Sequence, residues 1–307
     1  MIDAVAGTGT AGGRPRPRSG AATGAVPPTL LVFLAIISVQ IGAAVAKTLF
    51  PMLGSSGTVF LRIEFAALAL LIVGRPRLHG YRRADYGAAV LFGVAIAMMN
   101  AAFYAALARI PLGAAVTLEF VGPLGVAIAG SRRRLDTVWA VLAAGGIVLL
   151  APIDGAVIDP LGALLALLAG AGWAAYILLN VRVGRAFRGG DGLALALAVA
   201  AVAVLPLGVA AAGGRLFSPQ VLAPGAVVAL LSTIIPFSLE HAALKRLPAR
   251  VFGVLMSVEP IVAALVGFVV LHEALGARGL LALVLVTMAT VGSARTGAPG
   301  GRVTSDE

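Results

Sequence analysis

Cysteine is absent from this 307-residue sequence, and charged residues make up only 12% of it. The lack of cysteine excludes disulfides and thiolate metal sites. Hydrophobic residues reach 60%, against roughly 45–50% in soluble domains, and the mean hydropathy is +1.03. A soluble fold of this composition would have too little polar surface, so we expect an all-α, polytopic membrane protein.

Catalytic motifs are missing as well. The sequence contains no H-E-x-x-H, no G-x-S-x-G and no G-x-x-x-x-G-K-[ST]. His272 lacks the second histidine one helical turn later that a zinc pair needs. We therefore expect no enzyme, no cofactor and no metal site. The net charge of +10 does not indicate nucleic-acid binding, because the basic residues lie between apolar runs and do not gather on one face.

What the sequence does contain is apolar runs long enough to cross a bilayer, which takes about 20 residues in a helix. Charges, Pro or Gly bound ten of them, near 29–50, 56–73, 87–108, 111–130, 137–152, 160–180, 192–213, 222–243, 250–271 and 278–294. The first five form a unit over 29–152 and the second five a unit over 160–294. Residues 1–28, rich in Gly, Ala, Pro and Arg, predict a disordered cytoplasmic tail, and 295–307 a second cytoplasmic tail.

The distribution of the 23 Lys and Arg residues predicts the orientation. If the N-terminus is cytoplasmic, the outer loops hold only Arg109, Arg215 and Arg278, and Lys47 and Arg62 lie inside spans. The other eighteen all fall in inner segments. Under the positive-inside rule this bias places both termini in the cytoplasm.

An internal repeat relates the two units. ALARIPLGAAVTLEFVGPLGVAIAG (106–130) aligns without gaps at an offset of 137 with ALKRLPARVFGVLMSVEPIVAALVG (243–267), which superposes Pro111 on Pro248 and Pro123 on Pro260. Because each unit has an odd number of spans, the second enters the membrane inverted. Carriers built this way bind substrate near the midplane between the repeats and expose it alternately to the two sides.

Three long stretches carry a family resemblance: SVQIGAAVAKTLFP (Ser38–Pro51), PLGAAVTLEFVGPLGVAIAGSRR (Pro111–Arg133) and FSLEHAALKRLPARVFGVLMSVEPIVAALVGFVVLHE (Phe237–Glu273). Together they resemble EamA-domain carriers of the drug/metabolite transporter superfamily, in the subfamily of bacterial threonine/homoserine exporters. The resemblance implies a ten-helix inner-membrane protein that exports threonine, homoserine or related metabolites, driven by the proton gradient. The sequence departs from the family pattern at His241 and His272.

Polar residues inside the spans are few, and an ionisable group there usually faces a cavity or a partner. Helical spacing sorts many of them into stripes, such as Trp173, Tyr176 and Asn180. A zwitterionic amino acid offers an ammonium to a carboxylate and a carboxylate to Lys or Arg. The candidates for substrate binding or proton coupling are Gln40, Lys47, Arg62, Asn100, Tyr104, Glu119, Trp173, Tyr176, Asn180, Glu240 and Glu259. We also expect Pro123, Pro236 and Pro260 to break helices and free backbone groups for the site.

Several candidates have a structural alternative. Lys47, near the end of its span, would then extend to the outer surface, and Arg62 would make an ion pair between helices. Glu259 would serve helix geometry beside Pro260, and Trp173 and Tyr176 would only pack. His241 fits an interface residue better than a proton relay.

The sequence thus predicts a secondary active transporter that exports small amino acids or related metabolites by proton antiport and alternating access. Its partners would be a small polar substrate, protons and the lipid bilayer, with no nucleic acid. A carrier of another metabolite or drug, such as a purine or sugar derivative, stays open. A passive channel fits less well, because charged pore rings are missing.

Overall fold

The computed structural model describes residues 26–77, 79–129, 134–150, 159–188, 190–244, 246–247 and 249–296. Within these ranges all regular structure is helical. Apart from residues 26–28 and 295–296, the two predicted tails lie outside the described residues.

The first half of the chain contributes six helices: α1 (Pro28–Thr48), α2 (Phe50–Gly74), α3 (Arg83–Leu107), α4 (Leu112–Glu119), α5 (Val121–Ala129) and α6 (Arg134–Leu150). The second half contributes α7 (Pro160–Ala186), α8 (Asp191–Ala212), the 3₁₀ turn η1 (Gly213–Phe217), α9 (Pro219–Ala229), the π-helical turn η2 (Leu230–Ile234), α10 (Ile235–Leu244), α11 (Ala249–Met256), α12 (Glu259–Leu271) and α13 (Ala277–Thr296).

Eight helical segments of the described chain are long and apolar enough to cross a membrane. They coincide with eight of the ten expected runs. At the fourth and fifth runs the structure has two shorter apolar helical segments, Leu112–Val126 and Thr137–Leu149. The outward surface carries large apolar side chains, such as Val73 and Phe268, which suits contact with lipid. The chain is a multi-pass membrane protein, and the count of ten spans stays a prediction.

Two expected spans are broken into half-helices. The fourth is interrupted at Phe120, between α4 and α5, and the ninth at Ser257 and Val258, between α11 and α12. Pro123 and Pro260 follow these breaks, and a proline has no N–H to donate to the carbonyl four residues earlier. In both spans, the second half-helix thus begins one or two residues before its proline.

The helix bounds repeat along the chain. Shifted by 137 residues, α4 falls on 249–256, the bounds of α11, and α3 falls on 220–244, the extent of α9 to α10 within one residue. The packing repeats too. Helix α3 packs on α7 as α1 packs on α10, and α4 and α5 pack on α7 as α11 and α12 pack on α1. Equivalent helices of the two halves thus make equivalent contacts.

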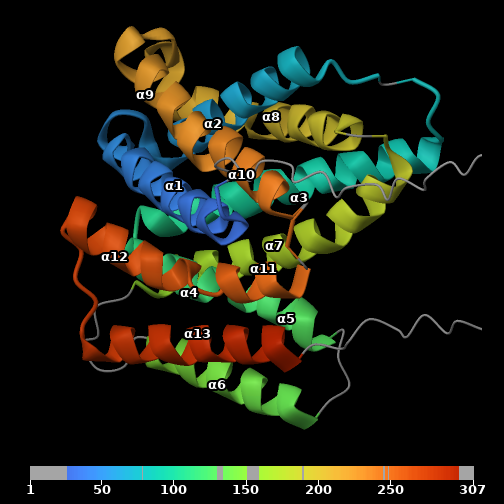
Figure 1. Ribbon diagram of the computed structural model, residues 1–307. Helices are drawn as coiled ribbons and strands as arrows, with labels where there is room; N and C mark the ends of the chain where they lie inside the picture. Colours follow the sequence, from blue (N-terminus) through green and yellow to red (C-terminus); the bar gives the residue numbers. More distant parts are fainter. Residues whose placement is uncertain are drawn as a thin grey trace, which may run out of the picture.

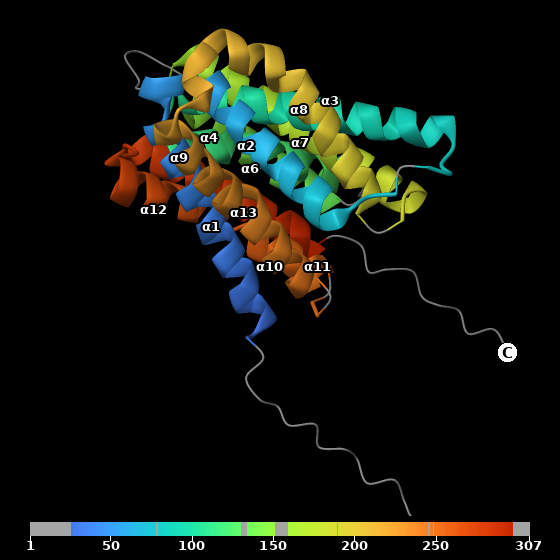
Figure 2. The same cartoon turned by 90° about the horizontal axis from the view of Figure 1, so that it is seen from above.

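The helices form a layered bundle (Figure 1). Helices α6 and α13 lie side by side at one edge, next to the layer that contains α4 and α12. Seen from above, α3 and α8 extend to the side opposite α12 (Figure 2). Small residues allow close approach between helices: a Cβ atom on Gly122 of α5 would collide with the carbonyl oxygen of Gly170 on α7. This contact sets α5 and α7 against each other.

Candidate functional site

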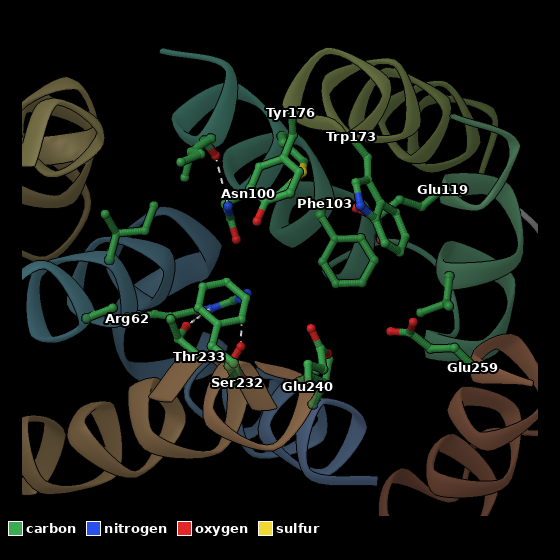
Figure 3. Close-up of a pocket in the computed structure, with 18 of the residues that line it drawn as sticks. Arg62, Asn100, Phe103, Glu119, Trp173, Tyr176, Ser232, Thr233, Glu240 and Glu259 are labelled. Atoms are coloured by element: carbon green, nitrogen blue, oxygen red, sulfur yellow. Dashed lines mark hydrogen bonds between the residues drawn. The ribbon is translucent and has the colours of Figure 1, made fainter. Parts of the chain in front are cut away.

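A cavity of about 200 Å³ lies between the two halves of the bundle. Helices of both units contribute to its wall, including α1, α2, α3 and α4 from the first and α7, α10 and α12 from the second. Eight of the eleven predicted residues line it: Gln40, Arg62, Asn100, Glu119, Trp173, Tyr176, Glu240 and Glu259. Figure 3 shows polar ends of Asn100, Tyr176 and Glu240 pointing into the open space.

One wall is basic. Arg62 of α2 donates from Nη2 to the Ser232 carbonyl (3.1 Å) and from Nε to Thr233 Oγ1 (3.4 Å). From behind the wall, the Tyr104 hydroxyl accepts a bond from Arg62 Nη1 (3.4 Å), and the Tyr104 ring centroid lies 5.5 Å from the guanidinium carbon. No carboxylate of the described residues forms a salt bridge with Arg62. The alternative role of Arg62, an ion pair between helices, is therefore not seen among the described residues.

The sequence explains why a backbone carbonyl is available to Arg62. Pro236, four residues after Ser232, has no N–H to donate to that carbonyl. The π-helical turn η2 directly precedes α10, in which Pro236 is the second residue, and such turns are frequent at functional sites. The neighbouring Leu231 carbonyl accepts a bond from Ser38 Oγ on α1 (2.8 Å). The carbonyl groups of η2 thus bind both Arg62 of α2 and Ser38 of α1.

The facing wall is acidic. Glu119 ends α4, Glu240 lies in α10 and Glu259 begins α12. Figure 3 shows Glu119 and Glu259 across the open space from Arg62, and Glu240 at its edge beside Ser232. Glu119 and Glu259 are buried, at 8% and 7% exposure. Gln40 of α1 donates from Nε2 to Glu259 Oε1 (2.9 Å). Positive and negative groups are thus separated across one small space.

Aromatic rings complete the wall. Trp173 packs edge-on against Phe120, with ring centroids 5.0 Å apart, and Tyr176 packs against Phe92 at 5.1 Å. Both also line the cavity, so packing and a cavity role are combined in the same side chains. Asn100 donates from Nδ2 to the Ile96 carbonyl (2.8 Å) within α3, which fixes its side-chain orientation.

Three predicted residues lie elsewhere. Lys47 donates to Glu273 Oε1 (2.5 Å) and to the Ile110 carbonyl (3.0 Å). Tyr104 is fully buried and reaches Arg62 from outside the cavity lining. Asn180 is exposed near the end of α7. The side chain of His241 lies outside the described structure.

Sequence reasoning missed several residues of the site. Phe103, Phe237, Met99 and Met256 line the cavity, and nothing in their spacing separates them from ordinary lipid-facing residues. Ser232 could have been found, because it stands four residues before a proline. Glu273, the partner of Lys47, also accepts a bond at Oε2 from the Leu112 N–H (2.7 Å).

A second ion pair lies outside the spans. Asp159 precedes α7 and accepts a hydrogen bond from the Leu161 N–H (2.9 Å), and it pairs with Arg109 Nη1 at 2.9 Å. The hydrogen bond from Arg109, together with that from Leu161, holds the pKa of the Asp159 carboxyl below its ordinary value. Both side chains are partly exposed, at 45% for Arg109 and 32% for Asp159, so this pair contributes little to stability.

Comparison with known proteins agrees with this architecture. The model of the EamA-like transporter family matches residues 160–295. A solved crystal structure superposes with a TM-score of 0.54 over 88% of this chain and 97% of its own, at 20% sequence identity, which shows a shared fold.

The curated relatives extend the match over most of the chain, which belongs to the EamA-like transporter family and is a membrane transporter, not an enzyme. These relatives bear the name threonine/homoserine exporter RhtA. The protein from Salmonella typhimurium (strain SL1344) is 41% identical over 271 residues, covering 88% of this chain and 92% of the relative. The protein from Escherichia coli (strain K12) is 42% identical with the same coverage.

Proposed function

We propose that this protein exports small amino acids, of the threonine and homoserine type, across the cytoplasmic membrane in exchange for protons. The observation that carries the proposal is one cavity lined by Arg62 and by the carboxylates Glu119, Glu240 and Glu259. The relatives named threonine/homoserine exporter supply the substrate type.

The charges of the cavity match a zwitterion. Arg62 has five N–H donors in a planar fork and forms bidentate pairs with carboxylates. No acidic residue of the described chain forms a salt bridge with its guanidinium, which therefore still has room for a carboxylate partner. A substrate carboxylate would meet this need, and the acidic wall would hold the substrate ammonium.

The size of the cavity favours a small substrate over a drug. Pockets for drug-sized ligands measure about 300–1,000 Å³, and this cavity measures about 200 Å³. A purine or sugar derivative has no fixed positive charge to place against the acidic wall. Both considerations favour an amino acid over the other substrates of the superfamily.

Proton coupling needs a carboxylate that gains and loses a proton during the cycle. Ionisable groups in the spans of pumps and transporters commonly serve this purpose. Glu240 is the best candidate, because it lies beside the open space (Figure 3) and no salt bridge in the described structure occupies it.

Alternating access would follow from two inverted repeats, 29–152 and 160–294, with both termini in the cytoplasm and ten spans in all. The equivalent helix bounds and the equivalent contacts of α1 and α7 support this arrangement. So do the broken helices at Phe120 and Ser257, since discontinuous helices at the midplane form the substrate site in many carriers.

Counterflow in proteoliposomes tests the proposal. Vesicles loaded with unlabelled threonine or homoserine should accumulate the labelled compound transiently, and an imposed pH gradient should drive net movement. A passive channel gives no counterflow. Lack of exchange with either amino acid would remove the substrate assignment, and net movement that does not respond to the pH gradient would remove the proton coupling.

A further inference from the structure

The Gln40–Glu259 pair is the most deeply buried polar contact in the cavity wall. Gln40 is 1% exposed and Glu259 7%, and they meet through the 2.9 Å bond from Gln40 Nε2 to Glu259 Oε1. They come from different halves of the chain, 219 residues apart. Both side chains line the open space.

Two acceptor atoms of this pair lack a partner. Gln40 Oε1 and Glu259 Oε2 are both buried and accept no hydrogen bond in the described structure. Buried polar atoms are nearly always bonded, and an unsatisfied one is costly. Rotating the Gln40 amide by half a turn would not help, because it would bring two acceptor oxygens together.

The chemistry of the missing partner follows from these two atoms. A partner from outside the pair must donate at least two hydrogen bonds, and with Glu259 ionised a positively charged group fits best. A primary ammonium has three donors and no acceptor. A proton on Glu259 Oε2 that is donated to Gln40 Oε1 would bond these two atoms to each other with no ligand. The two cases differ in the kinetics of Glu259→Gln, because a carboxylic acid that only pairs with Gln40 takes no part in substrate selection.

We infer that Gln40 and Glu259 form the subsite for the ammonium group of the substrate, which therefore must be a compound with a free primary amine. This inference rests on the proposed function and deepens it. Arg62, on the opposite wall, holds the other end of the substrate (Figure 3). Glu119 and Glu240 are then left free for proton movement, so substrate binding and proton coupling use different carboxylates.

Ligand analogues separate this subsite from the rest of the cavity. The α-hydroxy acid that replaces the threonine ammonium by a hydroxyl keeps the carboxylate and nearly the same size, and N-acetylthreonine has no ammonium. Neither should inhibit threonine counterflow by the wild-type protein at concentrations about 100-fold above the threonine KM, since sites built to bond a polar group reject analogues that lack it.

Two substitutions test the residues. Glu259→Gln should raise the threonine KM at least about 30-fold, because it removes a buried charged partner, and the α-hydroxy acid should then inhibit as well as threonine does. Gln40→Leu should raise the KM about 10-fold. Glu64→Gln is the matched control, because Glu64 is a partly buried carboxylate on α2 outside the cavity lining; its KM should be unchanged.

The outcomes are distinguishable. If the wild-type protein exchanges no amino acid, the proposed function fails. If it exchanges threonine but Glu259→Gln keeps the wild-type preference for threonine over the α-hydroxy acid, the subsite is wrong and the function stands. Should Glu259→Gln be inactive with every ligand, Gln40→Leu decides: an unchanged KM and an unchanged preference for the amine in that variant overturn the assignment.

Discussion

Two polar contacts link α1 to the two ends of α12, and they differ in whether their hydrogen-bond acceptors all have a donor. Gln40 and Lys47 lie seven residues apart on α1, about 10 Å along the helix axis. Gln40 meets Glu259 at the start of α12, and Lys47 meets Glu273 just after its end. In the second contact both carboxylate oxygens of Glu273 are bonded; in the first, two buried acceptors have no partner.

The Lys47–Glu273 contact therefore has a structural role, whereas the Gln40–Glu259 contact has the properties of a binding site. The Lys47–Glu273 contact joins α1, the Ile110 carbonyl and the first residue of α4 through three hydrogen bonds and leaves no buried acceptor without a partner in the described structure, so it has no need of a ligand. The Gln40–Glu259 contact keeps donors and acceptors unbalanced beside an open space, which a ligand would correct. Residue type alone does not distinguish the two, because each pairs a long polar side chain with a glutamate.

The largest expected effect is the loss of pH-driven export when Glu240, which lines the cavity, is replaced. Glu240→Gln should abolish pH-driven net export while threonine counterflow continues, because exchange of one substrate for another needs no proton transfer. The measurement is uptake by the same vesicles with and without a pH gradient. A variant that still couples export to the gradient would exclude Glu240 as the proton carrier.

An intermediate effect is expected from Lys47→Met. Breaking this pair leaves Glu273 and the Ile110 carbonyl without their partner, and removal of one member of a buried pair costs about 3–5 kcal/mol. Because both side chains are about one-fifth exposed, we expect roughly 2–3 kcal/mol. The threonine KM should not change.

Thermal unfolding in detergent measures this loss. The double variant Lys47→Met with Glu273→Met should recover part of the stability, because the remaining charge is removed too. A large KM change in Lys47→Met with normal stability would place Lys47 in the binding site and erase the distinction between the two contacts.

The smallest effect is expected at Asp159. Its folded-state pKa lies below the ordinary 3.8, so the carboxylate stabilises the fold at pH values above 3.8 and loses that contribution as the pH falls through the lower folded-state pKa. Asp159→Asn should lower the unfolding temperature slightly at pH 7. The difference in unfolding temperature between this variant and wild type should vanish in strongly acidic buffer. A difference that grows on acidification would contradict a stabilising role of the Asp159 carboxylate.

Hydropathy and spacing predicted much of this molecule, because both are properties of one helix at a time. Eight of the ten apolar runs coincide with long apolar helices, and Pro123 and Pro260 lie in the first turns of α5 and α12. The same reasoning predicted Trp173 and Tyr176, which line the cavity, and Asn180, which is exposed one turn further along α7 and does not line it.

Partners from distant parts of the chain could not be predicted in this way. Glu273 lies 226 residues from Lys47, and no periodicity connects them. Tyr104 shares a helical face with Asn100, yet it lies behind Arg62 and not beside the open space. The orphaned acceptors of Gln40 and Glu259 are visible only once the two halves are packed together.

The central claim is that an amino acid binds with its carboxylate on Arg62 and its ammonium on the acidic wall. Inhibition of threonine counterflow by threonine methyl ester, in wild type and in Arg62→Gln, tests it most directly. We predict that the ester inhibits the wild-type protein far less than threonine does, and that Arg62→Gln removes this preference. Equal inhibition by ester and acid in the wild type would contradict the account.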